Sequence, residues 1–351
     1  TVWRCIRLPL RDASLMAMQA TRGPYFTLAG RVSPPVLCRP AHRRCLPCHP
    51  LSPPKSPSGN DRRVPGAMAN AAKPANDTEW ADLSEEYASG IWIKTVSEIP
   101  AVRAAMSDSM KKIGSSALRV LDIGCGAGMY STVALDLGAA EVLGVDLAPQ
   151  MVEEARRAAA EWKAARAETE GPAWSREGNG STVKAEFVVG SVLDMSSKLP
   201  EGIGRDFDLA VCVYVLCNLE SKEAVLAALR EAAACLRPGG RLIIVDRHPV
   251  GFSSQKSPIF ESQLPSDADG DYYAEGVPIA ARLKVDTGKW IEFTNRRYTF
   301  GTWVELLGAA GFSLARLTEP NVPQEALRGM PEQMKRLAMH PISLLLVCEK
   351  R

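Results

Sequence analysis

The stretch RVLDIGCGAG spans residues 119–128, and VLGVD follows at 142–146. The apolar run before the glycines is typical of a strand buried on both faces of a parallel sheet. Gly124, Gly126 and Gly128 permit positive φ and remove the Cβ atoms that would keep a ligand from the backbone. Asp146 ends the second strand about twenty residues later, where its carboxylate can accept the hydroxyls of a ribose. The stretch predicts a strand, a glycine turn, a helix from near Met129 and a second strand around a nucleotide-like ligand.

Two ligand classes fit a glycine turn followed by an acid. A dinucleotide fold has the spacing G-x-G-x-x-G, but here the third glycine falls at Gly128 and Met129 follows it. Asp122, before the first glycine, would repel a pyrophosphate and attract an ammonium group. A nicotinamide-dependent oxidoreductase is therefore the weaker alternative.

These residues resemble the first motif of the class I S-adenosylmethionine-dependent methyltransferases, and the resemblance extends over roughly residues 80 to 350. It implies S-adenosyl-L-methionine as the cofactor and no metal. The positions that it assigns to the cofactor are Asp122 for the amino group, Gly124, Gly126 and Gly128 for the backbone approach, Asp146 for the ribose, Leu147 for the adenine face, and Ser191 with Val192 for the adenine edge.

The chain departs from the family at one of these positions. The family commonly places an acid directly after the glycine that ends its third strand, and here Ser191 follows Gly190. The backbone N–H of Val192 could still contact the adenine edge, and Asp194 lies close by. The segment 207–215 matches the fourth motif, and its far end, at Val213 and Tyr214, is expected to reach the sulfonium.

The fold class implied is α/β, with a Rossmann-like, seven-stranded, mostly parallel sheet, helices on both faces and an antiparallel last strand. Residues 77–351 are expected to form the methyltransferase domain, with a lid-like and mostly loop insertion at about 251–290. The periodicity predicts helices at 95–112, 149–167, 221–236 and 299–311, and later strands at 184–190, 207–215, 241–246, 311–317 and 342–348.

Residues 1–76 differ in composition from the rest of the chain. Arginine and proline recur there, acids are confined to Asp12 and Asp61, and no hydrophobic period persists, so we expect a disordered leader. It is either an organelle transit peptide, which places the protein in the chloroplast or mitochondrion, or translated sequence upstream of a start at Met68, which leaves it cytoplasmic. The C-x-x-C-H match at 45–49 is assigned to chance, because nothing helical surrounds it to seat a haem.

Composition limits the other function classes. The formal net charge of +2 gives no overall attraction to nucleic acid or to anionic membrane, and no apolar run approaches the length of a membrane span.

The apolar or helical surroundings of five cysteines predict reduced, buried thiols; these are Cys125, Cys212, Cys217, Cys235 and Cys348.

Candidates for the acceptor site lie after the later strands. His248 follows the fifth strand, and an imidazole is the side chain best suited near neutral pH to take a proton from a hydroxyl or amine. The alternative is a turn histidine bonded to backbone. Tyr214, Tyr272 and Tyr273 are further candidates. In the resembled family, leading helices cover the cofactor, which would bring Tyr87 near its methionine end, although a plain core position fits Tyr87 as well.

The sequence thus predicts an S-adenosylmethionine-dependent methyltransferase of a small-molecule acceptor. One alternative is a regulatory protein on the same fold that binds S-adenosylmethionine without catalysis. A less favoured one is an RNA methyltransferase, since no basic stripe interleaved with aromatic residues stands out.

Overall fold

The computed structural model describes residues 94–170, 176–177, 181–199, 205–250, 255–256, 260–285, 288–328, 332, 335 and 338–351. The chain divides into two units, residues 1–69 and 70–351, and all the described residues belong to the second. The leader expected at 1–76 and Tyr87 lie outside the described residues.

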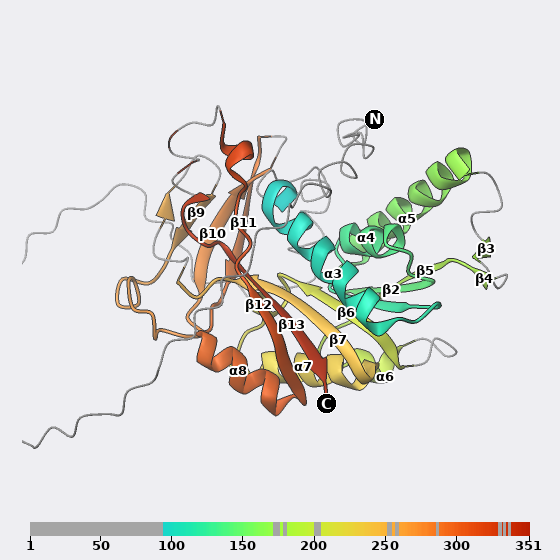
Figure 1. The fold of residues 1–351 in the computed structure, drawn as a ribbon. Coiled ribbons are helices and arrows are strands. Elements are labelled where there is room, and N and C mark those ends of the chain that lie inside the picture. Colours follow the sequence, from blue (N-terminus) through green and yellow to red (C-terminus); the bar gives the residue numbers. More distant parts are fainter. Residues whose placement is uncertain are drawn as a thin grey trace, which may run out of the picture. The chain divides into compact units, whose positions relative to one another are not determined.

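A seven-stranded sheet forms the centre of the second unit, in the order β12-β13-β7-β6-β1-β2-β5 (Figure 1). Its strands are β1 Arg119–Ile123, β2 Glu141–Asp146, β5 Lys184–Val189, β6 Phe207–Val213, β7 Leu236–Arg247, β12 Phe312–Thr318 and β13 Ser343–Lys350. Neighbours from β5 to β7 are parallel, whereas β13 runs antiparallel to both β7 and β12. The predicted fold class is confirmed. Because β1 lies between β2 and β6, the strand order reverses at its carboxyl end, where open α/β sheets bind ligands.

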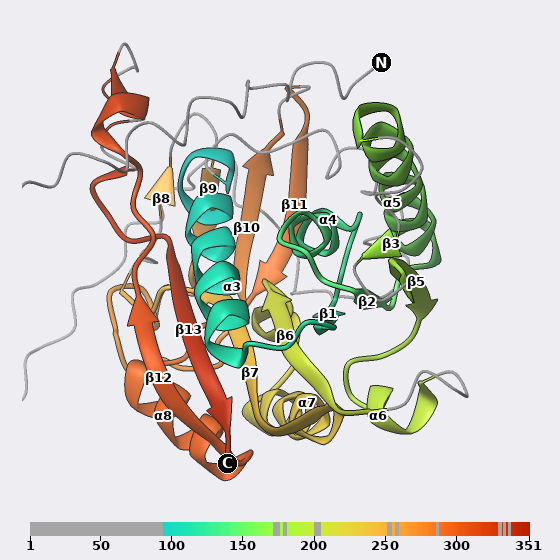
Figure 2. The same cartoon turned by 45° about the vertical axis from the view of Figure 1, so that its right-hand side comes forward.

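Helices cover both faces of this sheet (Figures 1 and 2). One face carries α3 Ile99–Ile113, α4 Met129–Asp136 and α5 Pro149–Glu170, and the other carries α6 Met195–Lys198, α7 Lys222–Cys235 and α8 Phe300–Ala309. The alternation along each strand explains the two layers. In β1, for example, Val120 packs with α3 and α4, while Leu121 and Ile123 pack with α7 and α8. Shorter helical turns are η2 Lys94–Glu98, η3 Leu216–Asn218 and η4 Gln324–Leu327.

The helices begin where the sequence provides caps. The Ser221 side chain accepts a hydrogen bond from the backbone N–H of Ala224, and the Thr299 side chain accepts one from that of Thr302. Each such cap stabilises its helix by about 1 kcal/mol. The predicted boundaries of α7 and α8 are therefore correct to within one or two residues.

Most of the described residues within 251–290 lie outside helices and strands, as expected of a loop segment, but short strands also occur there, and a role as a lid stays a prediction. A four-stranded antiparallel sheet crosses this segment in the order β11-β10-β9-β8. Its strands are β8 Gln255–Lys256, β9 Phe260–Gln263, β10 Ile279–Lys284 and β11 Trp290–Asn295. Ile279 and Ala281 alternate toward a small core with Phe260, so pairing between distant segments overrides the polar composition. A short hairpin of β3 Arg176–Glu177 and β4 Ser181–Thr182 likewise interrupts the loop expected at 168–181.

The five cysteines named above are buried and unpaired in the described part of the chain. Burial raises the pKa of the Cys235 thiol to about 11 and that of Cys348 to about 12, so both stay protonated and unreactive at neutral pH. No helix among the described residues is long and apolar enough to cross a membrane.

Candidate cofactor site

The glycine turn after β1 has one closely packed side and one open side. Gly124, Gly126 and Gly128 have φ values of +66°, +51° and +81°, a region that favours glycine. A Cβ on Gly124 would lie 2.3 Å from Cγ2 of Val215, whereas a Cβ on Gly126 would meet no atom within 4 Å. The backbone at Gly126 therefore faces open space, and the approach of a cofactor to it stays a prediction.

Asp146 connects the turn to the end of β2. One carboxylate oxygen accepts the Gly126 N–H at 2.8 Å, and the other accepts the Ala148 N–H at 3.0 Å. Burial raises the pKa of Asp146, and the two hydrogen bonds oppose that rise. Each oxygen keeps a further lone pair, so the carboxylate can hold the turn and still accept ribose hydroxyls.

Asp122 lies beneath the first turn of α4 instead of on an open surface. Its side chain accepts a hydrogen bond of 2.6 Å from the Ser131 hydroxyl, and the residue is only 2% exposed. Burial raises the pKa of Asp122 to about 6. This geometry supports a role in anchoring α4, and the contact with an ammonium group stays a prediction.

Apolar side chains are exposed around the ends of β2 and β5. Leu147 is 46% exposed and Leu193 is 43% exposed, and Val189 and Met129 are also exposed. The Ser191 hydroxyl accepts the Leu193 N–H at 3.2 Å, so it shapes the loop. Among the described residues, the N–H of Val192 finds no hydrogen-bond acceptor. Apolar walls beside a free N–H fit the face and edge of an adenine ring.

The end of β6 lies directly beside the glycine turn. Val213 is the last strand residue, and Val215 packs on Gly124. Tyr214, between them, is half-buried and has a φ of +53°. The approach of this strand end to the cofactor stays a prediction.

His248 is engaged at both ring nitrogens. Its Nδ1 accepts the backbone N–H of Val250 at 3.2 Å, so the proton lies on Nε2, which donates to Glu319 at 2.7 Å. The residue is 2% exposed and packs edge-on against the Phe300 ring at 5.3 Å. The geometry favours the alternative of a turn histidine, while its role as a base stays a prediction.

The two loop tyrosines proposed beside His248 occupy different surroundings. Tyr273 is largely exposed, and its ring meets that of Tyr272 edge-on at 5.2 Å. The Tyr272 hydroxyl accepts the N–H of Phe300 at 3.5 Å. Only Tyr272 is therefore connected to the residues that contact His248.

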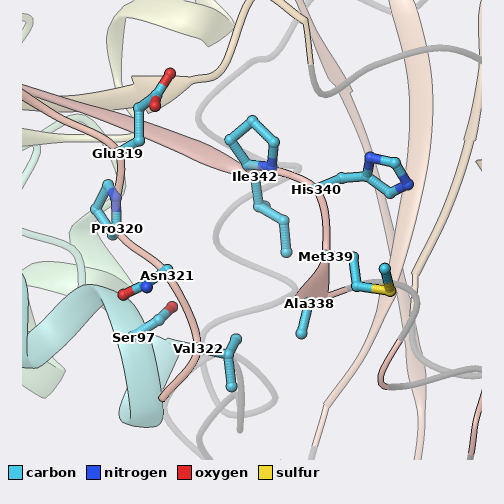
Figure 3. A pocket seen from close by; sticks show the side chains of 10 residues that line it. Ser97, Glu319, Pro320, Asn321, Val322, Ala338, Met339, His340 and Ile342 are labelled. Carbon is cyan, nitrogen blue, oxygen red and sulfur yellow. The ribbon is translucent and has the colours of Figure 1, made fainter. Parts of the chain in front are cut away.

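A cavity of about 300 Å³ lies between the segments that follow β12 and precede β13. Ser97, Glu319 and Asn321 line one side, and Met339, His340 and Ile342 line the other (Figure 3). Glu319 is the partner of His248, so this histidine lies behind the cavity wall. The lining mixes carboxylate, amide, hydroxyl and apolar groups, which suits a small polar molecule.

The residues present fit S-adenosylmethionine. The open side of Gly126 permits backbone approach, Asp146 supplies a carboxylate, and Leu147 and Leu193 supply an apolar wall. All belong to loops at the carboxyl ends of β1, β2 and β5, which are neighbours in the sheet. The loops that carry these candidate cofactor residues are thus neighbours at the carboxyl edge of the sheet. His248 follows β7, which is separated from β1 by β6.

Sequence reasoning missed several residues of this edge. Tyr130 and Ser131, directly after the glycine turn, each donate to a buried carboxylate, and their place in the first turn of α4 was a usable signal. Glu98, the acceptor for Tyr130, lies 32 residues earlier and has no local pattern that marks it. Leu193 could have been found from its position two residues after Ser191.

Residues 121–244 match the model of a family described as "Methyltransferase domain". This segment contains most of β1, the glycine turn, Asp146, strands β2 to β6 and most of β7. The chain thus contains a methyltransferase domain, and the predicted resemblance is confirmed for this segment.

The names of the curated relatives agree with this assignment. A ubiquinone biosynthesis O-methyltransferase from Xanthomonas campestris pv. campestris (strain B100) is 32% identical over 137 residues, which are 38% of this chain and 46% of that protein. The chain thus spans about half the length of the curated relatives that it matches.

Two solved structures are similar over most of their length. The CcbJ methyltransferase from Streptomyces caelestis has a TM-score of 0.49 and 17% identity, covering 79% of this chain and 99% of that one. An S-adenosylmethionine-dependent methyltransferase from Mesorhizobium loti has a TM-score of 0.45 and 22% identity, covering 70% and 96%. Because both TM-scores are below 0.5, the fold class is assigned from the strand order described above and not from these two structures.

Proposed function

We propose that this protein is an S-adenosylmethionine-dependent methyltransferase acting on a small-molecule acceptor. The observation that carries the proposal is the open glycine turn fixed by Asp146, within a segment that matches the methyltransferase domain family. When bound, S-adenosylmethionine would supply an electrophilic methyl group, and its sulfur would take the electron pair of the broken carbon–sulfur bond.

The chain's own contribution is to bind and orient the two reactants. Asp146 would accept hydrogen bonds from the ribose, because its carboxylate is held in place by two backbone N–H groups. Leu147 and Leu193 would enclose the adenine, and Val192 would donate to its edge. Alignment of two reactants for direct displacement supplies most of the rate that such a transfer requires.

The acceptor would bind at the carboxyl ends of β6 and β7, beside the second sheet. This position is supported by Tyr214 next to the glycine turn and by the cavity lined by Ser97, Glu319 and Asn321. The curated relatives are named as O-methyltransferases of ubiquinone biosynthesis. An oxygen of a small molecule is therefore the first acceptor atom to test, with the cofactor donating the methyl group.

Transfer of a labelled methyl group tests the proposal. Purified full-length protein would be incubated with S-adenosylmethionine carrying a CD3 group and a small-molecule cell extract, then analysed by mass spectrometry. We expect at least one metabolite to gain the labelled methyl group, and the Asp146→Ala protein to label it far more slowly. Binding of S-adenosylmethionine without any labelled product would favour the regulatory alternative. Transfer of the label to total cell RNA in a parallel reaction, with none to any small molecule, would exclude a small-molecule acceptor.

A further inference from the structure

His248 connects the two walls of the cavity shown in Figure 3. Its Nε2 donates to Glu319 at 2.7 Å, on the wall that follows β12. Its backbone N–H donates to the carbonyl of Ile342 at 3.1 Å, on the wall that precedes β13. The imidazole is buried and packs against the Phe300 ring. One buried residue therefore holds both walls, which favours a preformed cavity over a gap between independent loops.

The contact with His248 orients Glu319 without neutralising its charge. Because Nδ1 of the imidazole accepts the Val250 N–H, the proton lies on Nε2 and the ring is neutral. Oε1 of Glu319 accepts this proton, whereas within the described ranges Oε2 meets no donor and no lysine or arginine comes within ion-pair distance of the carboxylate. Glu319 therefore keeps a negative charge and one oxygen for a ligand.

The rest of the lining suits a small molecule with an apolar body and a few polar groups. Ser97 and Asn321 supply a hydroxyl and an amide on the same side as Glu319, and the opposite side carries the apolar chains of Met339 and Ile342. Among the lining residues that the structure describes there is no lysine or arginine. An anionic group would meet repulsion there, whereas a cationic group would be attracted.

The wall that carries Ser97 is joined to the cofactor turn. The next residue, Glu98, is 2% exposed, and its Oε1 accepts the Tyr130 hydroxyl at 2.5 Å. Tyr130 is the second residue of α4, directly after the glycine turn. The cavity wall and the cofactor turn therefore share one buried hydrogen bond, as expected of an acceptor pocket beside a cofactor site.

We propose that this cavity recognises the acceptor through a protonated amine that binds Glu319, with His248 as the positioning residue. This inference rests on the proposed function. An ammonium group supplies donors for Oε2 and compensates the negative charge, whereas a carboxylate or phosphate would add to it. An ammonium nitrogen has no lone pair, so the methyl group goes to another atom of the same molecule. The acceptor class is therefore a small amine that also carries a hydroxyl group.

Three phenols of similar size measure this preference without knowledge of the acceptor. Tyramine carries an ammonium group, tyrosol a neutral hydroxyl and 4-hydroxyphenylacetate a carboxylate. Full-length protein would be titrated with each by calorimetry, with and without S-adenosylhomocysteine, at pH 8, where an exposed imidazole such as that of His340 is neutral. Because the Glu319 side chain is 51% exposed, solvent screens the attraction. We expect tyramine to bind about tenfold more tightly than tyrosol, and 4-hydroxyphenylacetate to bind least tightly. Tyramine binding no tighter than tyrosol overturns the proposal.

Substitutions assign the preference to individual side chains. Glu319→Gln should bind tyramine and tyrosol equally, and a preference that persists in this variant overturns the proposal. Glu325→Gln is the matched control, because this exposed carboxylate lies six residues further along the chain and outside the cavity lining, and it should keep the wild-type preference. His248→Phe should weaken the preference for tyramine. His248→Gln, whose amide can donate in place of Nε2, should restore it, and the wild-type preference in His248→Phe would overturn the positioning role.

The acceptor found by methyl labelling provides the second test. Its product should contain a basic nitrogen, be retained by a cation exchanger at neutral pH and carry the CD3 group on oxygen. Glu319→Gln should raise the KM for this acceptor about tenfold with kcat near wild type. A product without a basic nitrogen, or with the label on that nitrogen, overturns the amine proposal and leaves the methyltransferase intact. Absence of any labelled product removes the proposed function, whereas the titrations with the three phenols do not depend on transfer, so the two failures are distinguishable.

Discussion

Replacing Gly126 by alanine should weaken cofactor binding more than it weakens the fold. At φ +51° an alanine is strained by about 1–2 kcal/mol, but its methyl group would meet no protein atom within 4 Å. That open space is the side from which the cofactor would reach the backbone. A methyl group there should reduce the affinity for S-adenosylhomocysteine at least tenfold, or about 1.4 kcal/mol.

Gly138 provides the matched control for this substitution. It follows α4 with a φ of +92°, and a Cβ there also meets nothing within 4 Å. Gly138→Ala should therefore lower the melting temperature about as much as Gly126→Ala does, by about 2–4 °C for each kcal/mol of strain. Unlike Gly126→Ala, it should leave the affinity for S-adenosylhomocysteine unchanged. Calorimetric titration and thermal unfolding of both variants provide the comparison. Equal affinities for Gly126→Ala and wild type would show that the turn does not face the cofactor.

Three further predictions concern acidic and histidine side chains. Asp146→Ala should cost on the order of 2–3 kcal/mol of cofactor affinity because charge-assisted hydrogen bonds are lost, and an unchanged dissociation constant in calorimetry would remove Asp146 from the site. Burial raises the pKa of Asp122 in the folded protein to about 6, above its ordinary value of 3.8. The folded state therefore takes up this proton at a higher pH than the unfolded state does, and the free energy of unfolding increases as the pH falls. Between pH 7.5 and pH 5, wild type should gain about 1.4 kcal/mol relative to Asp122→Asn, and identical pH dependence in denaturant unfolding would contradict this. His248→Ala, if the histidine fixes the turn through Val250 and Glu319, should lower the melting temperature while turnover per folded molecule stays near wild type, and a large loss of kcat at unchanged stability would restore its role as a base.

The glycine turn and Asp146 could be predicted from the sequence because their determinants are local. Positive φ at Gly126 and a carboxylate at the end of the next strand follow from residue type and spacing. The same holds for the caps Ser221 and Thr299, whose helices begin where expected.

The rest depends on contacts between distant segments. The pairing of β10 with β9 and β11 builds a sheet from strands in and next to the polar segment 251–290. Glu319, the partner of His248, lies 71 residues away, so nothing beside the histidine reveals it. The positive φ of Tyr214 also arises only in the folded chain.

Calorimetric titration of the full-length protein with S-adenosylhomocysteine, and separately with NAD⁺, tests the identity of the cofactor most directly. The glycine spacing, the open backbone at Gly126 and the exposed wall at Leu147 and Leu193 predict micromolar or tighter binding of S-adenosylhomocysteine and no heat with NAD⁺. Tight binding of NAD⁺ without binding of S-adenosylhomocysteine would contradict the assignment of this site.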